Sequence, residues 1–385
     1  RVFPERRRGW PVRPGTEAEL AEAVATAQGP LAIVGGGTRG VRPETGEVIE
    51  TGGLSGITLY EPGALTLVVQ AGTAVAEVET ALAAEGQRLA FEPMDHRGLL
   101  GTVGAPTIGG VIAANVSGPR RIQAGAARDF ALGVRFVDGT GTVIRNGGRV
   151  MKNVTGYDLV KLTAGSWGSL GVLTEVALKV LPAPAAQGSV VLTGLSTERA
   201  VAAMSRTLGS PFEVTGAAHL PEGPDGAPVT MIRVEGFEEQ VRYRTGRLQA
   251  LLEGFGAAHV ALDTAADWAA IRDVKPFHEA AGDVWRVSCK PSDAPALAEK
   301  AGASGLIFDW GGGLIWVLMP KGTDLRTRLG DFGGHATLVR AAPETRAQLG
   351  TFQSEPAPVA ALTAGLRARF DPKGLFNPGL MARAA

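Results

Sequence analysis

The chain has 385 residues, and its 38 lysine and arginine residues equal its 38 aspartate and glutamate residues in number. This length exceeds the roughly 250–300 residues at which a single core usually stops growing, so two domains are expected. The balanced charge gives no field that would draw the chain onto nucleic acid or an anionic membrane. The single cysteine, Cys289, excludes an intrachain disulfide, a cysteine-rich zinc site and a self-contained iron–sulfur cluster.

No run approaches the roughly 18 apolar residues that would span a bilayer, and no signal-like apolar segment follows Arg1. The first residue is not methionine, so the native start is expected upstream. We expect the run Arg6, Arg7 and Arg8 to be solvated. Cys289 is expected to be a buried or half-buried thiol.

The first part of the chain predicts helices and strands in a βα-like order. Residues 16–28 have helical spacing, because Thr16 and Glu19 match a capping box and the following apolar residues share one face. A strand follows at 31–34, and a helix at 74–85 is expected to start from Thr73 and to stop at Gly86. The other predicted strands are 65–70, 131–137 and 171–180, with turns at 138–139 and 146–148.

The segment from about 188 to 345 changes character, because strand-like runs alternate there with polar or alanine-rich helices. This pattern predicts a second α+β domain with a mostly antiparallel sheet. The predicted strands are 189–192, 229–234, 306–309 and 314–319, and the predicted helices are 238–253, closed by Gly254, and 360–369. We therefore expect a first domain at 1–184, a second at 185–345, and a C-terminal segment at 346–385.

A first glycine loop, Gly35 to Gly40, follows the predicted strand and fits the G-x-G-x-x-G pattern of a dinucleotide-binding fold. That fold needs a helix to begin within the loop, and the next residues, with Pro43 and Gly46, break any helix. The loop can instead form a nest of backbone N–H groups around an anion. A plain tight turn is the competing interpretation.

A second glycine-rich region spans residues 101–181, where small residues alternate with short β-rich runs. Glycine at this density is expected where φ is positive or where the main chain approaches a ligand closely. Residues 107–110 and 115–118 can present amides and hydroxyls to another stretch of the ligand that the first loop holds. A phosphate-containing cofactor is the expected ligand.

Ordered landmarks make the chain resemble the FAD-linked oxidases, which have an FAD-binding domain of the vanillyl-alcohol oxidase type. They are GGGT at 35–38, Pro93 and Asp95, TIGG at 107–110, Asp129, Lys152, GYDL at 156–159, GSWGSLGV at 165–172 and NPG at 377–379. Within this family, SGPRR at 117–121, RDFALG at 128–133 and FDWGGG at 308–313 resemble the FAD-binding subunits of bacterial glycolate oxidases. The fold implied is a two-subdomain FAD-binding domain plus a smaller α+β domain.

The resemblance implies a set of FAD contacts. Residues 35–39 would hold the pyrophosphate, while Asn377 would return from the tail to the flavin side. The full set is Gly35, Gly36, Gly37, Thr38, Arg39, Thr107, Gly109, Gly110, Asn115, Ser117, Gly118, Asp129, Gly171, Val172 and Asn377. A cap or turn role is the alternative for Asp129, and a turn role for Asn377.

Relatives that bind flavin covalently use a His or Cys near a glycine loop, where this chain has Thr38 and Arg39, so non-covalent FAD is expected. His96, the only histidine of the first domain, is expected at the surface or behind the cofactor contacts. The resemblance also implies two partners, a second FAD-linked subunit and an iron–sulfur subunit. Glycolate would be oxidised to glyoxylate by the complex, in the cytoplasm or peripherally at the inner face of the cell membrane.

Stand-alone dehydrogenases of D-2-hydroxy acids in this family carry a His-x-Gly-Asp-Gly-Asn-x-His strand that supplies metal ligands and a base. Here Asp309-Trp310-Gly311-Gly312-Gly313 stands instead, and no metal site or catalytic base is predicted. His219, His259, His278 and His335 are expected to be surface or structural residues. Arg233, Arg286 and Lys290 are candidate carboxylate partners, although solvated charges are the expected state of each.

The late aromatic residues are expected in the core, and part of the set could face a partner.

Three functions remain open on these grounds. The leading hypothesis is an FAD subunit that transfers electrons or assists within a glycolate oxidase. The alternatives are a stand-alone flavin dehydrogenase for another small 2-hydroxy acid, and a scaffold that has lost its flavin.

Overall fold

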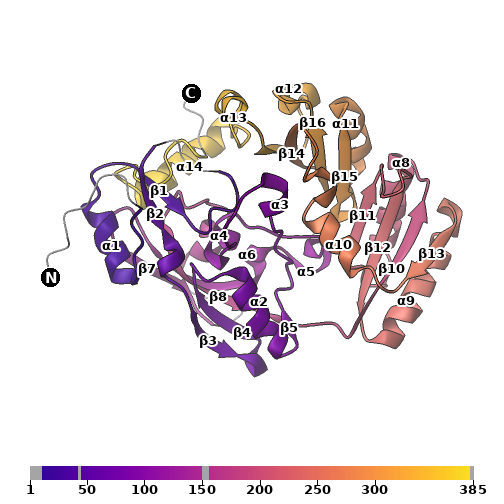
Figure 1. Ribbon diagram of the computed structural model, residues 1–385, viewed down its shortest axis with the longest axis horizontal. Helices are drawn as coiled ribbons and strands as arrows, with labels where there is room; N and C mark the ends of the chain where they lie inside the picture. The colour runs from indigo at the N-terminus through magenta and orange to yellow at the C-terminus, as the bar shows by residue number, and fades with distance from the viewer. Residues whose placement is uncertain (1–10, 42–44, 150–155, 382–385) are drawn as a thin grey trace.

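A computed structural model describes residues 11–41, 45–149 and 156–381. Arg6, Arg7, Arg8 and Lys152, which the sequence singled out, lie outside these residues. Within them, no helix is both long and apolar enough to cross a membrane. Figure 1 shows two lobes, one built from the indigo-to-magenta part of the chain and one from the pink-to-orange part. In the yellow C-terminal segment, residues 343–349 pack on the second lobe, and the chain then continues over the first lobe.

The first lobe starts with a helix that packs on a parallel pair of strands, α1 (Glu17–Thr26), β1 (Leu31–Val34) and β2 (Glu47–Glu50). Thr16 caps α1, because its side chain accepts the N–H of Glu19, as predicted. Leu20 and Val24 are fully buried on one face of this helix. The start and the type of this helix were thus correctly predicted from its apolar period and its cap.

A five-stranded antiparallel sheet forms the rest of the first lobe. Its order is β3 (Ile57–Glu61), β4 (Thr66–Gln70), β8 (Val172–Lys179), β6 (Ala131–Val137) and β7 (Val143–Gly147). A short antiparallel pair joins β5 (Gln87–Arg88) to β9 (Leu181–Pro182). The helices of this lobe are α2 (Val75–Ala84), α3 (Arg97–Leu100), α4 (Ile108–Ala113), α5 (Arg121–Ala124), α6 (Ala127–Phe130) and α7 (Leu159–Thr163).

One prediction about α2 was wrong. Ala74, not Thr73, is the N-cap residue, and it makes no side-chain cap bond. The Thr73 hydroxyl instead accepts the N–H of Gly56 at 2.8 Å. A bond across 17 residues therefore takes the hydroxyl that local spacing had assigned to the helix.

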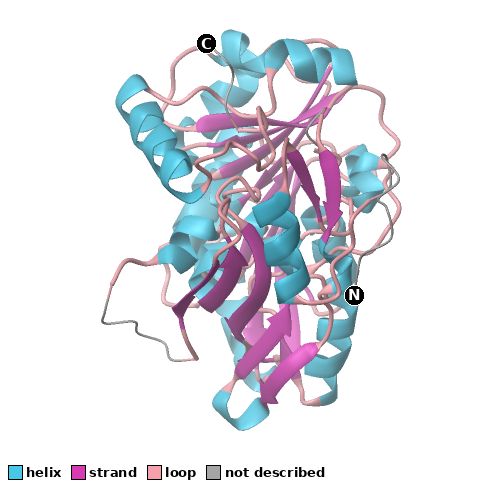
Figure 2. Ribbon diagram, turned by 90° about the vertical axis from the view of Figure 1, so that its left-hand side faces the viewer, coloured by secondary structure: helices cyan, strands magenta, loops and turns pink. Residues whose placement is uncertain are grey.

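An eight-stranded sheet, antiparallel at every pairing among the described residues, forms the second lobe. Its order is β13 (Ala258–Ala261), β10 (Ala186–Thr193), β12 (Val229–Gly236), β11 (Gly216–Leu220), β15 (Gly305–Asp309), β16 (Leu314–Met319), β14 (Asp283–Ser288) and β17 (His335–Arg340). The helices are α8 (Thr197–Leu208), α9 (Glu238–Leu251), α10 (Ala265–Arg272), α11 (Ala294–Ala301) and α12 (Leu325–Leu329). Figure 2 shows strands in the interior with helices outside. The fold class predicted from the sequence is confirmed.

The C-terminal segment contains α13 (Pro343–Leu349) and α14 (Ala357–Phe370) and then returns to β1. The N–H of Leu31 donates to the carbonyl of Leu375 at 2.7 Å, and the N–H of Asn377 donates to the carbonyl of Leu31 at 3.0 Å. Phe376 is buried beside α1.

The strands of the five-stranded sheet end at residue 179, and those of the eight-stranded sheet begin at 186. The domain limits at 184 and 345 stay predictions.

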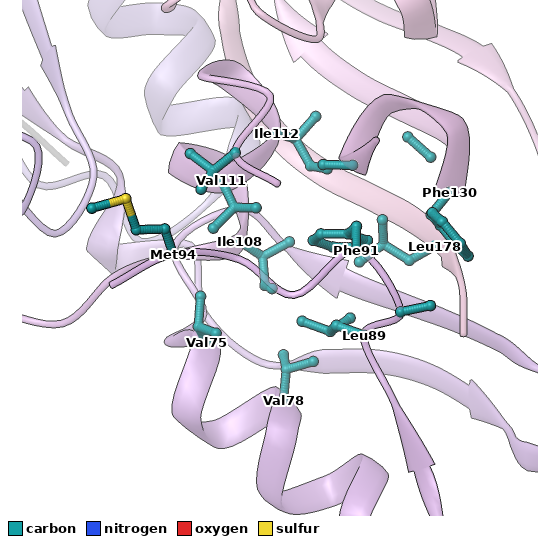
Figure 3. Close-up of a cluster of buried hydrophobic side chains, with 14 of the residues drawn as sticks. Val75, Val78, Leu89, Phe91, Met94, Ile108, Val111, Ile112, Phe130 and Leu178 are labelled. Atoms are coloured by element: carbon teal, nitrogen blue, oxygen red, sulfur yellow. The ribbon is translucent and has the colours of Figure 1, made fainter. Parts of the chain in front are cut away.

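A continuous hydrophobic core joins the two lobes. Figure 3 shows the part under α2 and α4, where Phe91 and Ile108 pack with Phe130 and Leu178 of the neighbouring elements. The same cluster continues to Trp310 and other side chains of the larger sheet. The late aromatic residues are buried as predicted, namely Trp268, Trp285, Trp310, Trp316, Phe277 and Phe308. A shared apolar core of this kind fixes how the lobes sit against each other.

Candidate functional site

The first glycine loop leaves β1 and turns back without a helix. Positive φ angles of 67° at Gly37 and 64° at Gly40 make the turn, and neither Val41 nor the residues 45–46 are helical. Among the described residues, no hydrogen-bond acceptor is in place for the backbone N–H groups of residues 36–39. Adjacent unpaired amides are the donor set of an anion nest. The geometry therefore favours the nest over both the dinucleotide-binding helix and the plain turn.

A cavity of about 110 Å³, here called the glycine cavity, runs along this loop. Its wall combines residues 33–41 with one side of α4, the turn at 166–168 and the start of β8. The predicted cofactor residues that line it are Gly35, Gly36, Gly37, Thr38, Arg39, Gly109, Gly110, Gly171 and Val172. Residues separated by more than 130 positions are thus brought to one wall.

Small residues are required where the two glycine loops meet. A Cβ atom on Gly110 would lie 2.6 Å from Nη1 of Arg39, and one on Gly36 would overlap the carbonyl oxygen of Ala105. Behind them, Thr107 caps α4, because its Oγ1 accepts the N–H of Gly110 at 3.2 Å. Thr107 therefore shapes the wall without lining the cavity.

A larger cavity of about 380 Å³, here called the arginine chamber, lies between the first lobe and the strands β14, β16 and β17. It shares Arg39, Val41, Ala114 and Trp167 with the glycine cavity, so the two are adjacent. Arg39, Arg121, Arg128 and Arg286 contribute to its wall, and no described aspartate or glutamate does. The chamber is therefore a cationic space next to the nest.

Burial sets the charge states within the chamber. It lowers the pKa of Arg39 and that of Arg286 to about 10 each, so both are still charged at neutral pH. Burial, together with the charge of Arg39, lowers the pKa of His96 to about 3. Burial and the charges of Arg286 and Arg121 also lower the pKa of His335. Both imidazoles are therefore neutral at neutral pH, while the guanidinium groups remain positive.

Beside the chamber, two glutamates and three arginines form a buried ion cluster between the lobes. Glu235 of β12 pairs with Arg120 at 2.7 Å and with Arg88 at 2.8 Å. Glu92, whose φ is 47°, pairs with Arg233 at 2.9 Å and with Arg120 at 3.0 Å. The expectation of a solvated Arg233 was wrong, because its partner Glu92 lies 141 residues away in the sequence.

The other predicted cofactor residues take varied places. Asn115 and Ser117 line the chamber, where their side chains accept the N–H groups of Arg128 and Ala127. Gly118 packs on Glu92, and its carbonyl accepts the indole N–H of Trp310 at 3.0 Å. These three residues connect the second glycine loop with the wall of the chamber.

Asp129 and Asn377 line neither cavity. The Asp129 carboxylate accepts the N–H of Ala126 at 2.9 Å, so the turn role describes it better than a cofactor contact. Asn377 is 4% exposed, and its side chain bonds the N–H of Ile33 and the carbonyl of Trp167. It therefore positions two residues that line the glycine cavity.

Sequence reasoning missed several residues of the chamber. His96 and His335 both line it. His96 was expected at the surface or behind the cofactor contacts, and His335 was expected to be a surface or structural residue. Arg121 and Trp167 were not singled out as site residues, and Arg286 was expected to be solvated. No short motif could have revealed them, because strand pairing brings Arg286 beside Thr337 and Trp316. His219 is buried on Thr230, and Cys289 is half-buried on the carbonyl of Gly312, as predicted.

Within the described residues, no group of three or more His, Cys, Asp or Glu side chains is arranged to hold a metal ion. Asp309, at the position of the missing histidine motif, is buried, and its Oδ1 accepts the N–H of Trp310 at 2.7 Å. Burial raises its pKa to about 7. Asp309 does not line the chamber, so it offers no direct base to a ligand there.

Comparison with known proteins places this geometry in a family. A model of an FAD binding domain matches residues 11–147. The glycolate oxidase subunit GlcE of Escherichia coli is 36% identical over 356 residues, which cover 91% of this chain and 92% of that protein. The chain belongs to the GlcE family of FAD-linked oxidases. It is thus an FAD-dependent oxidoreductase, and the predicted family and cofactor are confirmed.

Two further comparisons cover a shorter stretch or reach lower identity. The glycolate oxidase subunit GlcD of Bacillus subtilis is 38% identical over 120 residues, which cover 31% of this chain and 24% of that protein. An alkyldihydroxyacetonephosphate synthase structure aligns with a TM-score of 0.71 at 18% identity, and covers 96% of this chain and 76% of that one. This second likeness shows the fold alone.

The residues present fit FAD. Unpaired amides at 36–39 match the needs of a pyrophosphate, and Nε of Arg39 is buried with no hydrogen-bond partner in the described part of the chain. Glycines at 35–37 and 109–110 leave room for main-chain contact with an extended ligand. The arginine chamber adjoins this site and shares four lining residues with it.

Proposed function

We propose that this chain is the FAD-binding subunit of a glycolate oxidase, with FAD held non-covalently. In this proposal the backbone amides of residues 36–39 and the side chain of Arg39 hold the pyrophosphate. Gly109, Gly110, Gly171 and Val172 line the path of the cofactor. The likeness to the Escherichia coli glycolate oxidase subunit along almost the whole chain carries the proposal, and the row of unpaired amides beside a cationic chamber supports its cofactor part. No described His or Cys lines the glycine cavity, and Thr38 and Arg39 stand at the loop position used for covalent attachment in relatives.

The chain would act with a second FAD-linked subunit and an iron–sulfur subunit. Its own flavin would then transfer electrons within the complex or have an auxiliary role there. It would not accept electrons from glycolate without the partner subunits. Bound FAD supplies the electron acceptor. The arginines of the chamber would attract anionic substrate or stabilise negative charge, while His96 is neutral and the described part of the wall carries no carboxylate. A hydroxy acid needs a group that takes its hydroxyl proton. His96 and His335 are the imidazoles of the described wall, and burial lowers the pKa of both, so each would be a weak base there.

Two measurements on the purified chain test the cofactor part of the proposal. The absorption spectrum is expected to show about one flavin per chain, and acid or heat denaturation followed by filtration should release it. Flavin that stays with the precipitated chain would mean a covalent bond. A chain without flavin that takes up no added FAD would favour the scaffold and contradict the proposal.

A further inference from the structure

Three arginines of the chamber lack the partners that the chain gives its other buried arginines. In the described residues, Arg39, Arg121 and Arg286 form no ion pair and no side-chain hydrogen bond. Arg88, Arg120 and Arg233, a short distance away, are all paired with Glu92 or Glu235. Unpaired guanidinium groups at partly buried positions are costly, so an anionic ligand is the natural partner.

Trp310 holds two of these arginines in place without using their N–H groups. The Cζ atom of Arg121 lies 4.6 Å from the centroid of the indole ring, and that of Arg286 lies 5.0 Å from it. Trp310 itself is fixed by its bonds to Gly118 and Asp309 and is 7% exposed. Stacking orients a guanidinium and leaves its donors available to a ligand.

The strands of the second lobe add polar groups around Arg286. On β14, Arg286 pairs with Trp316 on one side and with Thr337 on the other. Ser288 and His335 form a pair two positions further along the same strands, and all five residues line the chamber. A carboxylate at the guanidinium groups would therefore have hydroxyl donors within the same wall.

We propose that Arg121 and Arg286, held on Trp310, form a subsite for the carboxylate of a small 2-hydroxy or 2-oxo acid. The anion subsite follows from the arginines alone, whereas the choice of hydroxy or oxo acid rests on the proposed function. The subsite binds the acid without requiring this chain to oxidise it. It therefore binds glyoxylate, the oxidised acid, as well as glycolate.

The phosphates of FAD are the competing source of negative charge. Arg39 reaches both cavities and lies against Gly110, so it belongs with the cofactor phosphates. Arg121 and Arg286 line the chamber only. Substitution of these two residues should thus separate acid binding from FAD binding.

The test uses the flavin-loaded chain and follows its absorption difference spectrum as glyoxylate, glycolate or the neutral amide glycolamide is added without oxygen. Saturable shifts are expected with both acids and none with glycolamide. In Arg121→Met and Arg286→Met, the Kd for glyoxylate should rise about tenfold or more, because each change removes a charged hydrogen bond. Flavin content and Tm should stay near those of the parent. The Kd of Arg286→Lys for glyoxylate should lie between that of the parent and that of Arg286→Met, because lysine keeps the charge.

Arg242→Met is the matched control, since Arg242 is exposed, pairs with Glu238 at 2.9 Å and lines neither cavity. Its Kd should change less than about twofold. Absence of saturable glyoxylate binding, equal binding by the Met variants, or loss of FAD from them would each overturn the subsite. Such a result would leave the proposed function standing if the parent chain still holds FAD, whereas a chain that takes up no FAD would defeat the proposed function first.

Discussion

The side-chain amide of Asn377 donates a hydrogen bond of 2.8 Å to the backbone carbonyl of Trp167, although the two residues lie 210 positions apart. Asn377 also accepts the N–H of Ile33 at 2.8 Å, so one buried side chain ties together two walls of the glycine cavity. The tail of the chain is thus part of the candidate FAD site.

Asn377→Ala is expected to weaken both the fold and cofactor binding. The change leaves the N–H of Ile33 and the carbonyl of Trp167 without their partner, at a cost of about 1–3 kcal/mol in the free energy of unfolding. Urea unfolding and flavin content measure the two effects. Gln249→Ala, which removes one bond to Ala258 of β13 at the opposite edge of the larger sheet, should leave flavin content unchanged. Full flavin content in the Asn377 variant would count against its role in the site.

Gly110→Val should remove FAD from a chain that remains folded. A branched side chain there would meet Nη1 of Arg39 and Oγ1 of Thr107 and would displace the cofactor from this wall. Flavin absorbance per chain gives the occupancy, and circular dichroism shows whether the fold persists. Gly246→Val is a suitable control, because a Cβ atom on this helical glycine meets nothing within 4 Å. Stoichiometric flavin in the Gly110 variant would disprove the assignment.

Glu235→Gln should destabilise the chain by about 3 kcal/mol or more, since it leaves Arg88 without a counter-charge and leaves Arg120 with Glu92 alone. Glu238→Gln removes only the exposed pair with Arg242 and should cost about 0.3–0.5 kcal/mol. Urea unfolding at pH 7 compares the two variants. Equal effects would show that the buried cluster contributes no more than a surface pair.

The same cluster should make stability depend on pH on the acid side. Burial would raise the pKa of Glu235, but Arg120, Arg233 and Arg88 outweigh it and lower that pKa. The pKa of Glu92 is lowered in the same way by Arg233 and Arg120. Depressed pKa values stabilise the fold above the unfolded value of about 4.3, and this contribution is lost as the pH falls below it. The loss between pH 5 and pH 3 should be smaller in Glu235→Gln, and an unchanged slope would refute this cause.

Asp309 should make the fold less stable as the pH rises, the opposite of the pH dependence expected from Glu235 and Glu92. Burial raises its pKa to about 7, so the folded chain binds the proton more tightly than the unfolded chain does. This carboxyl therefore makes stability fall as the pH rises from about 4 to 7. Asp309→Asn cannot titrate, so its stability relative to the parent should improve between pH 5 and pH 8. Urea unfolding at both values measures the change, and a constant difference would contradict the assigned pKa.

Local patterns predicted the elements that depend on neighbouring residues. The helix capped by Thr16 and the strand at 31–34 follow from period and cap, and the structure matches them closely. The first glycine loop was recognisable because unpaired amides and positive φ are properties of the loop itself. The wall of the chamber was not recognisable in this way. Arg286, His335 and Arg121 meet only through strand pairing and the contact between lobes, so their spacing along the chain carries no signal.

We propose that this chain holds FAD but depends on partner subunits for the oxidation of glycolate. Mixing the purified, flavin-loaded chain with glycolate in the absence of oxygen tests this dependence, when the oxidised flavin band is followed with and without the second FAD-linked subunit and the iron–sulfur subunit. We expect the band to persist in the isolated chain and to bleach when the partners are present. Rapid bleaching of the isolated chain by glycolate would contradict it.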